Sequence, residues 1–269
     1  MLLVLDVGNT QTVVGLYGHD ADADGPTAAL GAERDLLDHW RISTNAERTS
    51  DELALLVQEF LAFHGFSFDE DVDGVALCSS VPSVTTAVRE MSQRYFGFAA
   101  LVVEPGIKTG MPILYENPKE VGADRIADAV AAFDLYGGPT IVVDFGTATT
   151  LEAISPRGEY LGGAILPGVE ISLDALFGRA AALRRVELLE PRSVIGKNTV
   201  ESIQSGALYG FAAQVDGICE RMQDEIGPST VVATGGLAAL IAPQAKAIQH
   251  HEPWLTLHGL RLIFEKNRP

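Results

Sequence analysis

The chain has 269 residues, of which 47% are hydrophobic, so it can form one or two domains with a sizeable buried core. Its formal net charge of −17 argues against nucleic acid as a partner, because no basic stripe could neutralise phosphates. No apolar run approaches the roughly 18 residues of a membrane span, and no charged signal-peptide segment precedes the first strand. We therefore expect a cytoplasmic protein with no membrane partner.

Two short stretches, 138 positions apart, follow the same plan. Residues 2–10 and 141–149 each contain an apolar run that ends on an aspartate, followed by one apolar residue, a glycine and a small polar cluster. The apolar run is typical of a strand buried on both faces. A second strand-like run follows each stretch, at 12–17 and 150–154, so each copy predicts a β-hairpin.

The turn of each hairpin has the groups that phosphate oxygens require. Its glycine permits a tight turn and close approach of a ligand, and its hydroxyls and backbone N–H groups can bind phosphate. The carboxylates of Asp6 and Asp144 could hold Mg²⁺, a hard cation that takes oxygen ligands. One copy alone is better explained by a hairpin with a polar turn. Two copies favour a nucleotide cleft between related domains.

Further elements are predicted between and after these hairpins. In the first half we expect an exposed loop at 19–35, a strand at 37–43, a helix from 50 to about 64, a strand at 73–78, a helix to about 95, a short strand at 101–103 and a helix from about 124 to 136. Thr49 and Glu52 form a capping-box pattern ahead of the first helix. Residues 137–139 then break the chain, and we place a domain boundary there.

The second half continues with strands and helices. We expect a strand to 166, a helix from Gly168 to about 181, a helix capped by Asn198 or Thr199 that reaches about 226, and a strand at 230–234. The pair Gly235-Gly236 then fits either an adenosine site or a tight strand-to-helix corner. Cys78 and Cys219 lack the spacing of a zinc or redox site, and we interpret both as core residues.

The segment Gly122-Ala123-Asp124-Arg125 is the strongest candidate for substrate chemistry. A kinase that acts on an alcohol profits from a carboxylate that accepts the hydroxyl proton. A neighbouring arginine can bind a substrate carboxylate through two hydrogen bonds. A structural role is also open, in which Asp124 caps a helix and Arg125 pairs with Asp128.

Six segments resemble the type III pantothenate kinases, which belong to the superfamily of acetate and sugar kinases, Hsp70 and actin. They occur in the family's order, at 6–10, 115–125, 144–149, 167–168, 195–199 and 234–236. The resemblance implies an α/β fold of two related ribonuclease H-like (actin-like ATPase) domains, 1–139 and 140–269, with a nucleotide cleft between them. It also implies that ATP phosphorylates the primary hydroxyl of pantothenate, the first committed step of coenzyme A biosynthesis.

The same resemblance implies roles for single residues. Asp124 matches the proton acceptor, Asp6 lies near Mg²⁺, Thr147 contacts ATP, and Asp144 is a ligand of a required K⁺ or NH₄⁺ ion. The phosphate loop for ATP consists of Asp6, Val7, Gly8, Asn9, Thr10, Gln11, Thr12 and Val13. The pantothenate-binding residues are Tyr115, Gly122, Ala123, Asp124, Arg125 and Thr199. A homodimer with the site near its interface is implied as well.

Simpler interpretations stay open for several of these residues. Tyr115 could be a half-buried aromatic, Thr199 a helix N-cap and Asp144 a turn residue. The long acidic loop at 19–35 departs from the tighter hairpin usual in the family. Two other functions also remain: a different small-alcohol kinase of the superfamily, or a non-catalytic ATP-binding regulatory protein. The segment 117–125 argues against the first, and the intact Asp124 and Asp144 argue against the second.

Overall fold

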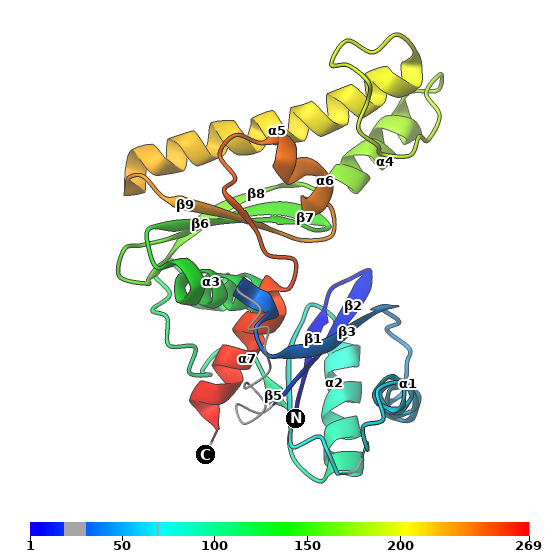
Figure 1. The fold of residues 1–269 in the computed structure, drawn as a ribbon, viewed down its shortest axis with the longest axis vertical. Helices are drawn as coiled ribbons and strands as arrows, with labels where there is room; N and C mark the ends of the chain where they lie inside the picture. Colours follow the sequence, from blue (N-terminus) through cyan, green and yellow to red (C-terminus); the bar gives the residue numbers. More distant parts are fainter. Residues whose placement is uncertain (19–30, 69, 269) are drawn as a thin grey trace. The chain divides into compact units, whose positions relative to one another are not determined.

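A computed structural model describes residues 1–18, 31–68 and 70–268. The chain forms two compact units: unit 1 contains residues 1–112, 116–131 and 254–269, and unit 2 contains residues 113–115 and 132–253. Each unit is built on a mixed five-stranded sheet (Figure 1). The domains expected from the sequence follow the repeated aspartate hairpin, whereas the two units are defined by contacts between residues. The expected domain limits therefore stay a prediction.

The sheet of unit 1 has the order β3-β2-β1-β4-β5. The first three strands of the chain pair antiparallel, and β4 and β5 continue the sheet parallel to β1. The strands are β1 (Leu2–Val7), β2 (Gln11–Tyr17), β3 (Leu36–Ser43), β4 (Gly74–Ser79) and β5 (Leu101–Val102). This order places the predicted hairpin of β1 and β2 at the centre of the sheet.

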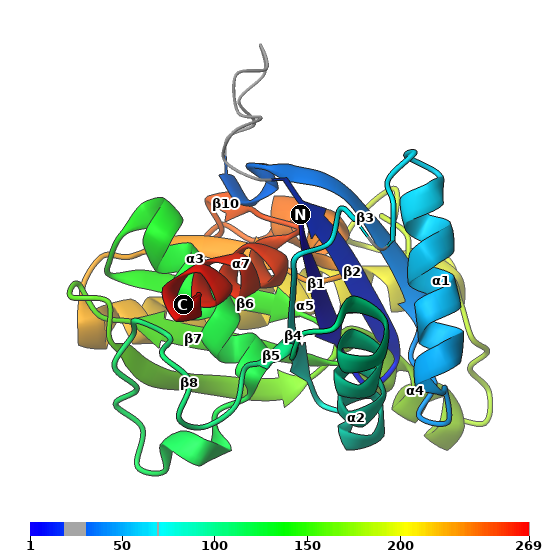
Figure 2. The same cartoon turned by 90° about the horizontal axis from the view of Figure 1, so that it is seen from below.

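Helices cover both faces of this sheet. Leu3, Leu5 and Val7 of β1 belong to a core cluster that includes buried residues of α1 (Ser50–Ala62) and α2 (Pro82–Met91). The opposite face packs against α7 (Leu255–Asn267), where Leu257 lies so close to Gly15 that a Cβ there would be 2.8 Å from it. Figures 1 and 2 show α7 on one side of the strands and the pair α1 and α2 on the other.

The predicted helices of unit 1 are present. Helix α1 (Ser50–Ala62) begins with the expected capping box between Thr49 and Glu52. Helix α2 (Pro82–Met91) continues as a π-helical turn, Ser92–Phe96, that ends at Gly97 with φ 78°. Helix α3 (Ala123–Tyr136) starts in unit 1 and ends in unit 2. None of the helices in the described part of the chain is long and apolar enough to cross a membrane.

The region 19–35 differs in part from the expected exposed loop. Residues 19–30 lie outside the described residues. Gly31–Glu33 forms a 3-10 helix in which Ala32 is buried, and Asp35 pairs with Arg261 of α7. The prediction of an exposed loop is therefore wrong for this end, because a contact with a helix more than 200 residues away orders it.

Unit 2 repeats the strand order of unit 1. Its sheet has the order β10-β9-β6-β7-β8, with β6, β7 and β8 antiparallel and β9 and β10 parallel to β6. The strands are β6 (Thr140–Phe145), β7 (Ala148–Ile154), β8 (Tyr160–Pro167), β9 (Thr230–Thr234) and β10 (His250–His251). The predicted strands of the second half are confirmed, and β10 is an addition.

The long predicted helix of unit 2 is α5 (Thr199–Ile226), which runs across one face of the sheet (Figure 1). Its N-cap is Asn198, whose side chain accepts a hydrogen bond from the N–H of Glu201. Thr199 is thus the first helical residue and not the cap. Helix α4 (Val169–Arg179) follows Gly168, and the short α6 (Ala238–Ile241) follows the glycine pair after β9.

Candidate functional site

Asp6 lies near the end of β1 and is half-buried. Side chains of successive strand residues point to opposite faces, so Asp6 lies on the face away from the core cluster that contains Leu5 and Val7. In the parallel pair with β4, its register partner is Cys78. The Cys78 thiol donates a hydrogen bond to Asp6 Oδ1 at 3.3 Å. Cys78 is thus a core residue, as predicted, but it also contacts the predicted metal-binding carboxylate, which the sequence did not indicate.

The electrostatic surroundings of Asp6 raise its pKa to about 6. Burial is the main cause, since it disfavours the charged carboxylate, and the nearby Asp124 carboxylate adds repulsion. The hydrogen bond from Cys78 and the charge of Arg41 act in the opposite direction. The structure therefore brings Asp6 and Asp124 close enough to interact, and a bound cation would relieve the repulsion between them.

The turn after β1 is held from behind by Thr44. The Thr44 hydroxyl donates to the carbonyl of Gly8 at 2.7 Å, and its N–H donates to the carbonyl of Thr10 at 2.9 Å. The hydroxyls of Thr44 and Thr12 are 2.8 Å apart. Sequence reasoning missed Thr44. The sequence offered one signal for Thr44, namely that it directly follows the last residue of the third antiparallel strand.

The predicted phosphate-loop residues therefore divide into two groups. Val7 and Thr12 are buried and support the turn. Asn9, Thr10 and Gln11 are exposed, and a Cβ on Gly8 would lie 3.1 Å from the carbonyl oxygen of Gln11. The turn thus offers side-chain and backbone donors to solvent from a rigidly supported backbone, the arrangement that suits phosphate.

Asp124 is the second residue of α3, so it does not cap the helix. Its Oδ1 accepts a hydrogen bond from the N–H of Arg125 at 2.8 Å. A Cβ on Gly122 would lie 2.4 Å from this same oxygen, so glycine leaves room for the carboxylate. Favourable interaction with the positive end of the helix dipole also stabilises an acidic residue in this first turn. Helix α3 approaches α7 closely, because a Cβ on Gly259 would lie 2.0 Å from the carbonyl oxygen of Ala127.

In unit 2, Asp144 occupies the position in β6 that Asp6 occupies in β1. It is half-buried, with Thr150 as its partner in β7 and Thr234 as its partner in β9. Backbone approaches it closely: a Cβ on Gly235 would lie 2.2 Å from Asp144 Oδ1, and φ at Gly235 is 93°. A carboxylate and nearby backbone carbonyls offer oxygen ligands, which alkali cations such as K⁺ accept. The residues here therefore fit the implied monovalent cation.

Thr147 lies exposed at the tip of this second hairpin. The carbonyls of Gly146 and Thr147 face Gly168, where a Cβ would lie 2.7 Å and 2.1 Å from their oxygens. The predicted Pro167-Gly168 segment therefore packs directly against the turn, which explains its glycine. Both segments are among the six that resemble the type III pantothenate kinases, and the structure brings them together.

Tyr115 is half-buried in unit 2. Its ring lies over Gly162, where a Cβ would be 3.5 Å from two ring carbons, and its edge meets the ring of Tyr160 at a centroid distance of 6.3 Å. The Tyr160 hydroxyl donates to the buried Glu152. Thr199 is exposed at the first turn of α5. Within the described residues, no hydrogen bond joins Thr199 to Tyr115.

Among the residues that the structure describes, no three His, Cys, Asp or Glu side chains group as metal ligands. Mg²⁺ in kinases is often held by only one or two carboxylates together with substrate phosphates and water. Asp6, half-buried and repelled by Asp124, has the donor chemistry for such a partial ligand set.

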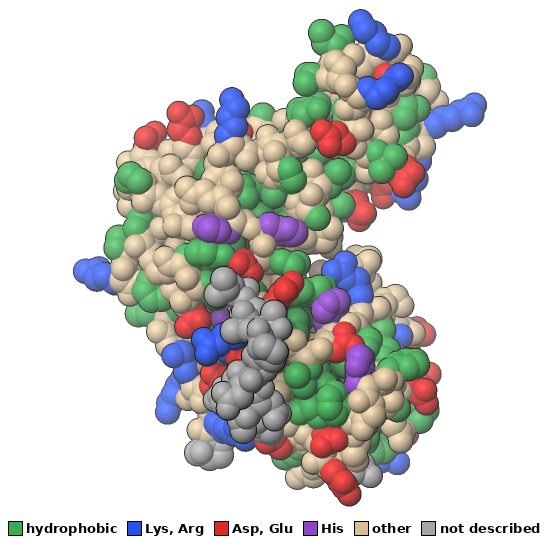
Figure 3. Space-filling model, in the orientation of Figure 1, with side chains coloured by type: hydrophobic (Ala, Val, Ile, Leu, Met, Phe, Trp, Pro, Cys, Tyr) green, Lys and Arg blue, Asp and Glu red, His purple; other side chains and the backbone are tan. Residues whose placement is uncertain are grey.

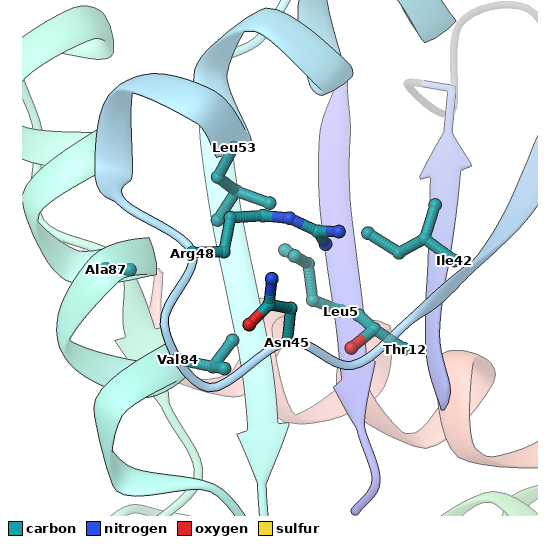
Figure 4. Close-up of a pocket in the computed structure, with 8 residues that line it drawn as sticks. All are labelled: Leu5, Thr12, Ile42, Asn45, Arg48, Leu53, Val84 and Ala87. Atoms are coloured by element: carbon teal, nitrogen blue, oxygen red, sulfur yellow. The ribbon is translucent and has the colours of Figure 1, made fainter. Parts of the chain in front are cut away.

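A pocket in unit 1 lies on the face of the sheet that packs against α1 and α2 (Figure 4). It is lined by Leu5, Thr12, Ile42, Asn45, Arg48, Leu53, Val84 and Ala87. Only Thr12 belongs to the predicted phosphate loop, and its hydroxyl is bonded to Thr44. The carboxylates that carry the predicted chemistry therefore lie outside this pocket.

Comparisons with known proteins identify relatives of this chain. A family model described as type III pantothenate kinase matches residues 2–221. A type III pantothenate kinase from Streptomyces griseus is 55% identical over 99% of this chain and 98% of its own, and one from Thermobifida fusca is 53% identical over 99% and 100%.

Solved structures with little sequence identity share the fold. A Campylobacter jejuni protein assigned to the Baf family of transcriptional activators has a TM-score of 0.59 at 17% identity, with 98% of both chains covered. The ethanolamine utilization protein EutJ from Carboxydothermus hydrogenoformans has a TM-score of 0.52 at 14% identity, over 97% of this chain and 89% of its own. The shared fold alone does not identify a family, but the sequence matches do. This chain belongs to the type III pantothenate kinase family.

Proposed function

We propose that the protein transfers the γ-phosphoryl group of ATP to the primary hydroxyl of pantothenate, producing 4'-phosphopantothenate and ADP for coenzyme A biosynthesis. The observation that carries this proposal is that the Asp124 carboxylate lies near enough to Asp6 in unit 1 to raise its pKa, together with family membership. A carboxylate that can accept a proton thus lies beside one that can hold a metal–phosphate complex, as alcohol phosphorylation requires.

Asp124 is the general base of this proposal. As the oxygen–phosphorus bond forms, the hydroxyl proton of pantothenate moves to a carboxylate oxygen of Asp124, and the bond between the β-oxygen and the γ-phosphorus breaks. Asp124 Oδ1 is oriented by the N–H of Arg125 at 2.8 Å, which leaves Oδ2 for the substrate. Arg125 binds the carboxylate of pantothenate through its guanidinium fork.

The remaining assigned residues bind and orient the substrates. The phosphates of ATP lie against the backbone and side chains of residues 8–11 and against Thr147. Tyr115, supported by Tyr160, packs on pantothenate, and Gly122, Ala123 and Thr199 complete its contacts. Bound near Asp6, Mg²⁺ would neutralise charge on the phosphates, and Asp144 would hold K⁺ or NH₄⁺.

The test of the base is Asp124→Asn, assayed by ADP release with pantothenate. We expect turnover to fall by roughly 10²–10⁴-fold, because a general base contributes that much. Asp51→Asn is the matched control, since Asp51 is also the second residue of its helix but is exposed on α1. Full activity of Asp124→Asn would refute the role. An enzyme that binds ATP and releases no ADP with pantothenate would favour the regulatory alternative.

The cation assignment has its own test. Asp144→Asn should raise the K⁺ concentration needed for half-maximal activity by about tenfold or more, the usual effect of disturbing a metal site. Asp174→Asn, which removes an exposed carboxylate of α4, should leave the K⁺ dependence unchanged. An identical K⁺ dependence of Asp144→Asn and the native enzyme would contradict the assignment.

A homodimer is the second part of the proposal, and exposed apolar side chains of unit 2 support it. These large hydrophobic residues are Ile165, Ile171, Leu176, Leu189, Val194, Ile195 and Val200. Figure 3 shows hydrophobic side chains among charged ones at the α4 end of unit 2. Several large apolar side chains exposed in one region commonly mark an interface. A cytoplasmic location stays a prediction.

Sedimentation analysis tests the dimer. The native protein should sediment as a dimer, and Ile195→Asp should shift it toward monomer because Ile195 is 70% exposed on this surface. Leu55→Asp places the same charge at a 62% exposed position of α1 in unit 1, and it should remain dimeric. A monomeric native protein would contradict this part of the proposal.

A further inference from the structure

Arg41 lies in the same cross-strand row as the Asp6 carboxylate. Its register partner in β2 is Val13, the partner of Val13 in β1 is Asp6, and the partner of Asp6 in β4 is Cys78. Residues directly opposite each other in adjacent strands project from the same face of the sheet. Arg41 and Asp6 therefore share a face, and the charge of Arg41 is close enough to favour the ionised form of Asp6 and lower its pKa.

The guanidinium of Arg41 extends toward the turn of the first hairpin. Its Nη1 donates a hydrogen bond to Gln11 Oε1 at 3.2 Å, and Gln11 is the first residue of β2 after the turn. Gln11 lies two positions before Val13 in β2, so the side chains of these two residues project from the same face. The Arg41 side chain therefore extends along this face, from the row of Val13 toward the turn. Both side chains are exposed. The positive charge thus lies at Gln11, directly after the turn, and is exposed rather than in the core.

No carboxylate in the described part of the chain lies within 4.0 Å of the Arg41 guanidinium. Among the described arginines of unit 1, ion pairs are made by Arg34, Arg89, Arg94, Arg261 and Arg268, whereas Arg41, like Arg48, makes none. This contrast is informative in a chain with a net charge of −17, where acidic partners are abundant. Among the residues that the structure describes, the hydrogen-bond partner of Arg41 is a neutral amide, so most of its donors stay available.

We propose that the guanidinium of Arg41 binds the phosphate chain of ATP, as a substrate-binding residue outside the phosphate loop itself. Arginine presents a planar fork of donors that matches phosphate oxygens through two parallel hydrogen bonds. The site otherwise contains the carboxylates of Asp6 and Asp124, which repel an anionic nucleotide. Arg41 offsets part of that repulsion from the open edge of the sheet, since β3 is its terminal strand.

The inference rests on the proposed function, because it takes ATP as the nucleotide, and binding measurements test it separately from turnover. Isothermal titration calorimetry on the full chain with Mg²⁺ would compare β,γ-imido-ATP, ADP and AMP. Arg41→Met removes the charge and keeps an apolar stem. The affinity for β,γ-imido-ATP should fall roughly 10- to 100-fold, as expected for a charge-assisted pair, whereas the affinity for AMP should change little. Arg41→Lys, which keeps the charge without the fork, should give an intermediate loss.

The control variant is Arg89→Met, which removes an exposed arginine of α2 that pairs with Glu104 and should leave all three affinities unchanged. Unchanged affinity of Arg41→Met for β,γ-imido-ATP would overturn the proposal. An equal loss for β,γ-imido-ATP and AMP would also overturn it, because AMP lacks the β- and γ-phosphates that Arg41 is proposed to bind. If the native enzyme failed to phosphorylate pantothenate, the proposed reaction would fall, but the nucleotide series would still decide the role of Arg41.

Discussion

The two hairpins that carry Asp6 and Asp144 share a backbone plan and differ in their neighbours. Strands β1 and β6 each have six residues and an identical burial pattern, with the aspartate at the fifth position. Beside Asp6 the next strand contributes the thiol of Cys78, and beside Asp144 it contributes Thr234 followed by Gly235. A side chain thus contacts the first carboxylate, whereas the backbone of Gly235 closely approaches the second.

This difference has a physical consequence for each unit. In unit 1 the charge of Asp6 depends on groups that can be altered singly: Asp124, Cys78 and Arg41. In unit 2 the position of Asp144 depends on the absence of a side chain at Gly235. The same strand order therefore supports a carboxylate with a shifted pKa in one unit and a carboxylate confined by backbone in the other.

The largest expected effect in this comparison is that of Gly235→Ala. The substitution should lower the free energy of unfolding by about 2–4 kcal/mol, because it combines an overpacked contact with a positive φ. The added Cβ would lie 2.2 Å from Asp144 Oδ1 and 2.6 Å from the Phe145 nitrogen. Urea denaturation measures the change.

The corresponding position in unit 1 provides the control, since Ser79 follows Cys78 as Gly235 follows Thr234. Ser79→Ala removes two hydrogen bonds with the backbone of Val81 and should cost only about 1 kcal/mol. If Gly235→Ala cost no more than Ser79→Ala, the confinement of Asp144 by backbone would be the wrong explanation.

The next effect is a pH-dependent stabilisation by Asp6→Asn. The pKa of Asp6 is about 6 in the folded protein against 3.8 ordinarily. The folded state therefore binds a proton more tightly than the unfolded chain, and rising pH destabilises it between about pH 4 and 6. At pH 8 the penalty is at most about 3 kcal/mol, and a neutral asparagine removes it.

Denaturation in metal-free buffer at pH 4 and pH 8 tests this prediction. Asp6→Asn should be more stable than the native protein at pH 8 and similar to it at pH 4. Asp51→Asn controls for the loss of one exposed carboxylate. A stability difference that is the same at both pH values would show that Asp6 does not carry the strained charge of this site.

The smallest effect is that of Cys78→Ala, which removes the thiol donor. Because the Cys78 hydrogen bond lowers the pKa of Asp6, its loss should raise that pKa further and move the destabilising window to higher pH. Loss of the bond at neutral pH should cost about 1 kcal/mol. Cys219→Ala is matched in burial and makes no hydrogen bond to a carboxylate, so it should leave the pH profile unchanged. Equal pH profiles for the two variants would exclude a role for the thiol at Asp6.

Much of the fold could be predicted because its signals are local. Short sequence patterns predict the capping box of Thr49 and Glu52, the cap of α5 at Asn198 and both aspartate hairpins. The structure has each of them. The repeated plan of residues 2–10 and 141–149 also indicated two related halves, which have the same strand order. Helix α7 was not expected, because its packing against β1 joins opposite ends of the chain.

The surroundings of the site could not be predicted in the same way. The sequence by itself determined that Asp6 and Asp144 end buried strands, and that Asp124 begins a helix. Only the tertiary structure decided that Cys78, 72 residues away, donates to Asp6, and that Thr44, 36 residues away, holds the turn at Gly8. The physical reason is that strand pairing fixes these contacts: a shift of one residue would turn every side chain to the opposite face, and no local pattern records which register is adopted.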